Sequence, residues 1–520
     1  MSNFIKTIFV ILIIAIVIFL AILIFNNRDK TDIGKPARKL SEEDDVYQDD
    51  LRIAVADLDT FNPILSKNRN VYEVSKVIYE PLISLDMNYR LEYALAERVE
   101  KKNDTQYIVY LREAKWHDGS KVKSEDFHFT INMINNSDSI YKENIEKIAS
   151  VKSINDSSFI ITLKSPQEYF EYKLTFPIMK KVNEKTFKDK NRMLLGSGLY
   201  KFSDSKNNVL TFTKFEDYWN KEAKEDASFN AILIYKFGTV GEVYNAFKSG
   251  NIDIINSMNS NYTNQIGTYG YIDNEYKSRD FYFLAINTKK INKNIRKAIS
   301  LSIDKEKLVT ELGKGITFSP FPTDFGHWTY PQLHKLEHNL EEAKKILTSN
   351  SYELKSGKWI EKNTKKKLSF QILVNGDNKL QTKAANNIAD KLNKFGIETT
   401  VRKRYGNTYY AEVRNRNYDL AIIGRRQDLT PSLSSYFGNN NYSSYNHKEV
   451  QELLVEAELE QDEEKVLELY NKVYNIYLED IPFIGLYRTT RRLITSLGLH
   501  MDSMPNSYNI LNNISKWYRK

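Results

Sequence analysis

The chain has 520 residues and a formal net charge of +8; 41% of its residues are hydrophobic and 27% are charged. This length predicts about three folding units, and the composition is that of a soluble globular protein, not of a disordered chain. Lysine and arginine (75) are interspersed with aspartate and glutamate (67) along the whole length, which argues against a one-sided basic surface for nucleic acid. Cysteine is absent, which excludes disulfides, thiol catalysis, cysteine-ligated metals and a lipid anchor on cysteine.

An uncharged apolar stretch lies near the N-terminus, at residues 7–25. Its length matches the hydrocarbon core of a bilayer. It ends in Ile24-Phe25-Asn26-Asn27, without the small residues that precede a signal-peptidase cleavage site. We therefore expect one uncleaved N-terminal transmembrane helix, a signal anchor. Residues 26–45 are rich in charge and contain too little apolar surface to fold, so we expect a disordered tether after the helix.

Alternating apolar and polar residues predict strands at 51–56, 107–111 and 159–163. Helical spacing of apolar residues at 240–247 predicts a helix closed by Gly250, and the apolar run at 252–255 predicts a strand directly after it. A helix followed at once by a strand indicates α/β packing.

The C-terminal half predicts mixed sheets covered by helices. The amphipathic stretch 379–395 predicts a long helix that stops at Gly396, and the strands on either side of it make a right-handed βαβ unit. The predicted strands are 368–374, 397–402, 418–424 and 483–487, and the other predicted helices are 408–414, 447–460 and 463–478.

Residues 105–127, TQYIVYLREAKWHDGSKVKSEDF, combine a strand, a tight loop at Trp116-His117-Asp118-Gly119, and a helix with Ser124 as its cap and Asp126 in its first turn. This stretch resembles the signature of the family 5 extracellular solute-binding proteins, the oligopeptide-, dipeptide- and nickel-binding family. Collinear matches extend the resemblance over about residues 50–518, at Phe61-Asn62-Pro63, Tyr79-Glu80-Pro81-Leu82, Gly196-Ser197-Gly198-Leu199-Tyr200, Tyr218-Trp219-Asn220, Lys248-Ser249-Gly250-Asn251-Ile252-Asp253 and Arg296-Lys297-Ala298-Ile299-Ser300-Leu301-Ser302-Ile303-Asp304.

The resemblance implies an α/β, two-lobed periplasmic-binding-protein-like fold of type II, with an extra domain inserted in the first lobe. The expected ranges are 46–84 with 195–278 and 490–520 for the first lobe, 85–194 for the inserted domain and 279–489 for the second lobe. Hinge segments are expected at 279–282 and 487–490, where the chain would pass between the lobes.

The function that the resemblance implies is capture of oligopeptides between the lobes and their delivery to the permease subunits of an ABC transporter. Neither enzymatic activity nor a cofactor or bound metal is expected, nor a nucleic-acid partner. The protein is expected to be a monomer held in the cell membrane by residues 7–25, with its soluble body on the extracytoplasmic side. Arg28 and Lys30 would favour a cytoplasmic body by the positive-inside bias, but the resemblance outweighs them.

The resemblance also points to ligand-binding residues after the predicted strand 418–424. In peptide-binding members this strand is followed by a Trp and, three residues later, by an Asp that pairs with the amino terminus of the peptide. Asp428 is in register here, and Arg425 replaces the Trp. A carboxylate in a closing cleft is a strong partner for an ammonium group, whereas the alternative is an Asp that caps the turn before Pro431.

Five residues besides Asp428 complete the candidate site. Arg425 and Arg426 are candidates for contact with a ligand carboxylate, and Gly424 precedes them at the end of the strand. Trp328 and Tyr330 lie in a loop rich in proline and aromatic residues and are candidates for a side-chain pocket.

Three alternatives stay open. His334 and His338 stand four residues apart with Glu337 between them, a spacing that would place both imidazoles on one helix face in a zinc-dependent enzyme. Nickel or haem binding within the same fold is a nearer alternative, against which Asp428 favours a ligand with an amine. A receptor that senses peptides without feeding a permease is equally compatible with a membrane anchor.

Overall fold

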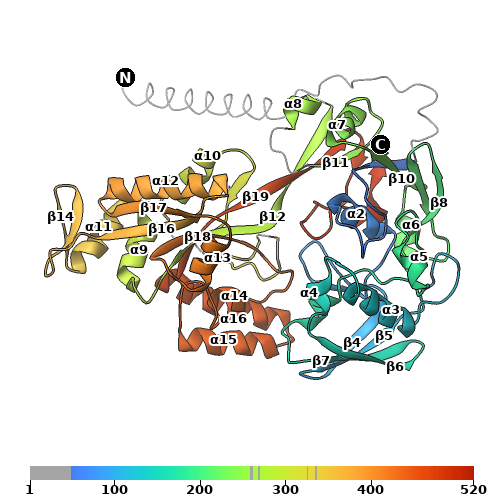
Figure 1. Cartoon of the computed structure of the whole chain (residues 1–520), viewed down its shortest axis with the longest axis horizontal. Helices are drawn as coiled ribbons and strands as arrows, with labels where there is room; N and C mark the ends of the chain where they lie inside the picture. Colours follow the sequence, from blue (N-terminus) through green and yellow to red (C-terminus); the bar gives the residue numbers. More distant parts are fainter. Residues whose placement is uncertain (1–48, 258–261, 268–269, 325, 334–336) are drawn as a thin grey trace, which may run out of the picture.

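The structure is a computed structural model that describes residues 49–257, 262–267, 270–324, 326–333 and 337–520. The predicted transmembrane helix and tether lie outside these residues. Within them, none of the helices is both long and apolar enough to span a bilayer. The described chain forms two lobes, which lie on the left and right of Figure 1.

One mixed sheet of eleven strands runs through both lobes. Its strands lie in the order β17 (Glu398–Arg404), β16 (Ser369–Asn375), β18 (Leu420–Arg426), β12 (Tyr271–Ile286), β19 (Phe483–Ser496), β11 (Ile254–Ser257), β1 (Asp50–Ala56), β10 (Ala231–Phe237), β9 (Val209–Lys214) and β8 (Tyr200–Lys206), and β13 (Ile316–Phe318) pairs with β19 outside that path. We call the lobe with β1 the first lobe and the lobe with β16 the second lobe.

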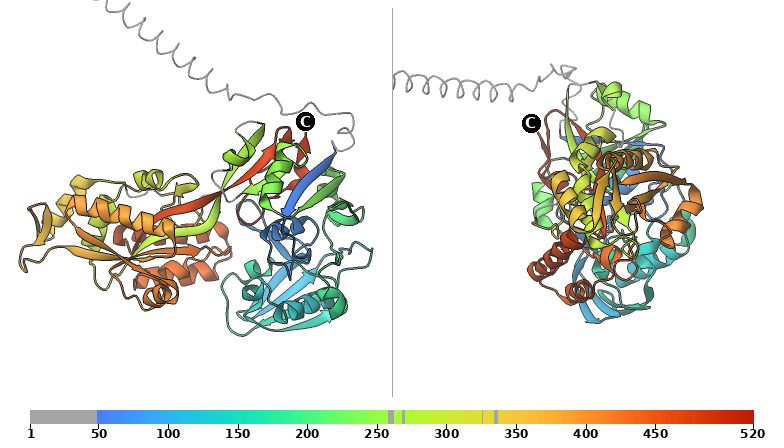
Figure 2. Two further views of the ribbon diagram at one scale, coloured as in Figure 1. Left: turned by 45° about the horizontal axis from the view of Figure 1, so that its top comes forward. Right: turned by 90° about the vertical axis from the view of Figure 1, so that its left-hand side faces the viewer.

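The antiparallel strands β12 and β19 run from one lobe into the other, as Figures 1 and 2 show. At one end of this pair, Tyr276 and Leu493 belong to the hydrophobic core of the first lobe. At the other end, Leu284 belongs to a core of the second lobe. The ladder changes register between Lys277 and Phe281, within the stretch where the chain passes between the two cores.

The predicted strand 483–487 is wrong in length, because β19 continues to Ser496. Residues 488–492 read Arg-Thr-Thr-Arg-Arg and lack the alternation by which a strand is recognised in sequence. Ladder pairing with β12 on one side, and with β13 and then β11 on the other, keeps this polar segment extended. The tertiary structure therefore decides the second half of the strand.

A separate four-stranded sheet lies in the first lobe, in the order β4 (Ala96–Asn103), β5 (Gln106–Leu111), β7 (Ser158–Leu163) and β6 (Ile148–Asn155). Helix α3 (Ser124–Asn135) packs on it, with the ring of Phe127 stacked on that of Phe159 at 4.6 Å. The prediction that Ser124 caps this helix is wrong, because Lys123 is the cap residue. Asp126 accepts a hydrogen bond from the backbone N of Lys123 at 2.9 Å, while the Ser124 hydroxyl donates to the carbonyl of Asn155.

In the second lobe, β16, α12 (Lys379–Phe395) and β17 form the predicted βαβ unit. The side chain of Asn378 caps α12, and Gly396 ends it in the left-handed conformation at φ +100°, which glycine adopts without strain. The helix buries Ala384, Ile388 and Leu392 against the sheet. A second hydrophobic core lies on the other face, under α15 (Lys448–Leu459) and α16 (Glu463–Asp480).

Apart from 483–487, the predicted helices and strands begin and end within two residues of the observed ones. The remaining elements of the first lobe are α2 (Arg69–Val74), η2 (Ser75–Val77), β2 (Ile83–Leu85), β3 (Leu91–Tyr93), α4 (Lys142–Ile145), η3 (Phe170–Leu174), α5 (Glu184–Lys188), α6 (Lys221–Asp226), α7 (Val240–Lys248), α8 (Thr263–Ile266), β20 (Leu499–His500), η4 (Ile514–Lys516) and β21 (Tyr518–Arg519). Those of the second lobe are α9 (Lys293–Ser302), α10 (Lys305–Leu312), α11 (Leu340–Ser349), β14 (Tyr352–Lys355), β15 (Lys358–Glu361), α13 (Gly406–Arg414) and α14 (Ser434–Phe437).

Candidate ligand-binding site

The end of β18 brings three of the candidate residues beside the crossing strand β12. The ladder pairs Gly424 with Tyr282, Arg425 with Phe281, and Arg426 with Asp280. Successive side chains of a strand point to opposite faces, so Arg425 lies on one face of the sheet while Gly424 and Arg426 lie on the other.

Asp428 is an exposed carboxylate with one weak partner in its own lobe. Nη2 of Arg425 donates to Oδ2 of Asp428 at 3.4 Å, and 53% of the Asp428 side chain is exposed. Arg425 is fixed more firmly, since its Nη1 donates to the hydroxyl of Tyr442 at 3.0 Å and its guanidinium lies 5.8 Å from the ring centroid of Tyr436. Asp428 therefore keeps room for further donors.

Gly424 is required by packing. A Cβ at this position would lie 2.5 Å from Cε1 of Tyr282, a separation that side chains do not tolerate. The ring of Tyr282 stacks on that of Tyr487 of β19, with centroids 4.6 Å apart. Gly424 thus lets the ring of Tyr282, which stacks on that of Tyr487, lie against the end of β18.

Arg279 of β12 also belongs to this region, although the sequence analysis placed it only in the predicted hinge. Burial, and next the nearby positive charge of Arg426, lower the pKa of Arg279, while Tyr72, Tyr89 and Asp428 act in the opposite direction. The carbonyl of Arg279 accepts a hydrogen bond from the backbone N of Gln427 at 2.8 Å, so Arg279 lies beside the charged end of β18. An arginine in a strand carries no local signal for such a position, because the fold alone brings the two lobes together.

Trp328 lies at a contact between the lobes. Its backbone N donates to the carbonyl of Asn88 at 3.0 Å, and its Nε1 donates to the hydroxyl of Tyr172 at 3.1 Å. The ring of Tyr330 packs edge-on against that of Phe321, with centroids 5.8 Å apart. The two aromatic residues thus serve lobe–lobe contact and packing in this structure.

A polar cluster joins the first lobe to helix α15 and the loop before α14. The hydroxyl of Ser432 donates to Oε2 of Glu168 at 2.7 Å. The hydroxyl of Ser434 lies 2.8 Å from Oε1 of Glu458 and 3.3 Å from Oε2 of Glu168. Burial, and next the hydrogen bond and negative charge of Glu168, raise the pKa of Glu458 to about 8. No local sequence signal marks this cluster, because its members lie far apart in the chain.

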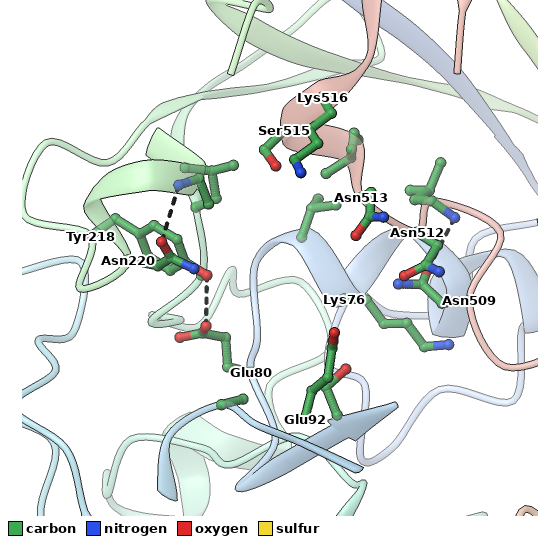
Figure 3. A pocket seen from close by; sticks show the side chains of 18 of the residues that line it. Lys76, Glu80, Glu92, Tyr218, Asn220, Asn509, Asn512, Asn513, Ser515 and Lys516 are labelled. Atoms are coloured by element: carbon green, nitrogen blue, oxygen red, sulfur yellow. Dashed lines mark hydrogen bonds between the residues drawn. The ribbon is translucent and has the colours of Figure 1, made fainter. Parts of the chain in front are cut away.

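A polar cavity of about 550 Å³ lies wholly within the first lobe and is shown in Figure 3. Glu80, 6% exposed, accepts hydrogen bonds from the hydroxyl of Tyr218 and from Nε1 of Trp219, both at 2.9 Å. Asn512 and Asn513 lie on the opposite wall. None of the candidate residues of the sequence analysis lines this cavity.

The model of the bacterial extracellular solute-binding proteins, family 5 (middle region), matches residues 90–448, more than half of the chain. The chain belongs to this family. As a family 5 protein it is a solute-binding protein of a transport system and not an enzyme.

Among its relatives, the dipeptide-binding protein DppE of Bacillus subtilis is 23% identical over 82% of this chain and 84% of its own length. The periplasmic oligopeptide-binding protein OppA of Salmonella typhimurium is 25% identical over 80% and 82%. A solved structure, the nickel ABC transporter protein of Bacillus halodurans, is 17% identical, covers 89% of this chain and 99% of its own, and has a TM-score of 0.76. At that identity it shows the shared fold alone.

The zinc alternative does not fit a family 5 protein. His334 lies outside the described residues, and Nδ1 of His338 lies 2.8 Å from the carbonyl oxygen of Leu301. Across the described part of the chain, no three side chains of His, Asp or Glu gather closely enough to hold a metal ion.

Proposed function

We propose that this family 5 protein binds short peptides with a free amino terminus between its lobes, at the end of β18, and hands them to an ABC transporter. Two relatives that cover most of the chain carry dipeptide and oligopeptide binding in their names. Asp428 receives the ammonium group of the peptide, and Arg425 and Arg426 lie beside it. Trp328 holds a neighbouring contact between the lobes, Tyr330 packs against Phe321 close to it in the chain, and Gly424 lets the ring of Tyr282 lie against the end of β18.

The observation that carries the proposal is the half-exposed Asp428 carboxylate beside the crossing strands. A charge-assisted hydrogen bond strengthens when lobe closure removes water from both partners. Its bond to Arg425 is long, at 3.4 Å, so the carboxylate accepts an ammonium group without giving up a strong partner. The backbone of an extended peptide would add affinity that does not depend on its sequence.

The test compares Asp428→Asn with the native protein against peptides that have free or acetylated amino termini. Leaving the ammonium group without its carboxylate costs on the order of 2 to 5 kcal/mol, or about 30- to 4,000-fold in affinity. Acetylation and the substitution should not add, since each removes the same pair. Asp104→Asn is the matched control, because Asp104 is also an exposed carboxylate paired with a cation three residues away. Unchanged peptide affinity in Asp428→Asn would reject this role.

We further propose that residues 7–25 hold the protein in the cell membrane as a monomer, with its body on the extracytoplasmic side. The support is the length and apolarity of that stretch together with a family of extracellular proteins. The full-length protein should stay with membranes in high salt, and protease added to intact cells should digest the body. A body fully protected from the protease would exclude this orientation.

A further inference from the structure

The end of β18 and the adjoining part of β12 carry more positive than negative charge. Nε of Arg279 is buried and has no hydrogen-bond partner among the described residues. The guanidinium of Arg426 is exposed and forms no ion pair within 4.0 Å in the described part of the chain. Arg425 adds a third cation. Three arginines therefore lie where the crossing strands meet β18, with Arg425 on the opposite face of the sheet from Arg426.

Two carboxylates lie nearby, and each makes a weak contact with a neighbouring side chain. Among the described residues, the one contact found for the Asp428 carboxylate is with Arg425 at 3.4 Å. Asp280 is the ladder partner of Arg426, but the contact found for its carboxylate is with the hydroxyl of Ser278 at 3.4 Å. Neither carboxylate forms an ion pair with Arg279 or Arg426 in the described residues.

Two further arginines on β19 add to this excess of positive charge. Arg488 is fully buried, and it donates to the hydroxyl of Ser319, to the carbonyl of Pro322 and to Oε1 of Gln427, without an ion pair among the described residues. Arg491 is 8% exposed, and its Nη1 has no hydrogen-bond partner among the described residues. Bringing the lobes together around such a surface removes water from cations that have no counter-ion, which is unfavourable unless a ligand supplies one.

We propose that the site selects acidic peptides: the amino terminus binds Asp428, and a carboxylate of a side chain near that terminus binds Arg279 and Arg426. This assignment rests on the proposed function and adds the class of peptide to it. Arginine presents planar donors that match a carboxylate with two parallel hydrogen bonds.

The first experiment uses the full-length native protein and needs no variant. Calorimetry compares tetrapeptides with free amino termini and amidated carboxyl termini that differ only in Glu, Gln or Lys at the second position. We expect the Glu peptide to bind about 10- to 100-fold more tightly than the Gln peptide, the range of a charge-assisted hydrogen bond, and the Lys peptide to bind more weakly still. The advantage of Glu should shrink as salt rises.

Two further ligands identify the source of the negative charge. A Gln peptide with a free carboxyl terminus tests the terminal carboxylate. It should regain only part of the affinity that is lost when Glu is replaced by Gln in the amidated peptides. Free glutamate tests whether a small acid suffices, and it should bind far more weakly than the Glu peptide. Equal binding of free glutamate would overturn the assignment of an acidic peptide.

The substitutions Arg279→Gln and Arg426→Gln, alone and together, test the two named residues. The double variant should lose the preference for Glu over Gln while still binding the Gln peptide. Arg98→Gln is the matched control, because it removes one positive charge from an exposed site on β4. Arg279→Lys keeps the charge and should keep part of the preference if Arg279→Gln proves unstable.

The outcomes separate the two proposals. Glu and Gln peptides that bind native protein equally would overturn the acidic preference and leave peptide binding intact. A preference for Glu that survives in the double variant would overturn the assignment to Arg279 and Arg426. Absence of binding by all the peptides, acidic ones included, would overturn the proposed function itself.

Discussion

The hydroxyl groups of Tyr169 in the first lobe and Tyr470 on α16 in the second lobe lie 2.8 Å apart. The Tyr169 hydroxyl also donates to the carbonyl of Ala457 on α15 at 3.1 Å, so Tyr470 is the donor of the bond between the two rings. Arg90 and Glu463 form an ion pair at 2.6 Å in the same contact area. The lobes of this solute-binding protein therefore touch through specific polar groups and not only through β12 and β19.

Tyr169→Phe should weaken this contact. The substitution removes a donor and an acceptor and leaves the Tyr470 hydroxyl with one partner fewer, at a cost of about 1–3 kcal/mol. Without ligand, the variant should show a larger radius of gyration in small-angle X-ray scattering. Tyr410→Phe, at a site that is 55% exposed, is the control and should scatter as the native protein does. The role given to Tyr169 is wrong if both variants give the same curve.

The contact should also weaken as pH rises, through Glu458 and Glu168. In the contact, the pKa of Glu458 is raised from its ordinary value of 4.5 to about 8, so joining the lobes takes up a proton. The contribution of this group is fully present below about pH 4.5 and is lost as pH rises through about 8. The facing hydroxyls of Tyr169 and Tyr470 stay protonated there, because burial raises the pKa of both.

Fluorescence energy transfer can measure this opening. The chain has no cysteine, so Ile154→Cys and Lys345→Cys, one in each lobe and both exposed, accept labels selectively. Transfer should fall between pH 6 and 9 in otherwise native protein. Glu458→Gln should flatten the curve, and Glu452→Gln on the same helix, where 64% of the side chain is exposed, should not. If energy transfer does not change with pH in the labelled protein that keeps Glu458, the contact between the lobes does not depend on protonation of Glu458.

Glu80 predicts a second pH effect, on the stability of the first lobe. Burial raises its pKa to about 7, against the hydrogen bonds from Trp219 and Tyr218 that lower it. The contribution of Glu80 to the free energy of unfolding is present below about pH 4.5 and decreases as pH rises through 7. The loss between pH 6 and 8 is about 1 kcal/mol. Thermal unfolding should show this loss, and Glu80→Gln should reduce it, whereas the exposed Glu113→Gln should leave it unchanged.

Gly424→Ala should lower the midpoint of urea denaturation. The added methyl group meets the Tyr282 ring and disturbs its stacking on Tyr487, which corresponds to about 1–3 kcal/mol of overpacking. Gly326→Ala is the control, since a Cβ there meets nothing within 4 Å. Equal midpoints for the two variants would show that Tyr282 moves aside freely.

Local patterns predicted most of the elements, whereas the ligand-binding residues stay predictions. Asp428 was predicted from its register after β18, and the structure places it beside Arg425. Trp328 was predicted for a ligand pocket, and the structure places it against Asn88 and Tyr172. A loop rich in aromatic residues indicates buried contact without saying which surface it meets, and that surface comes from a distant part of the chain.

The sequence by itself determined the helices and strands, because period and capping are local properties, and it determined the family, because the motifs lie in collinear order. Only the tertiary structure decided how far β19 runs, since its polar half stays extended through the pairing of β12 and β11. It alone brought Arg279 of β12 beside the end of β18, which carries Arg426 and leads to Asp428. Charges that are far apart in the chain interact through space, and their balance exists only once the crossing strands have brought the lobes together.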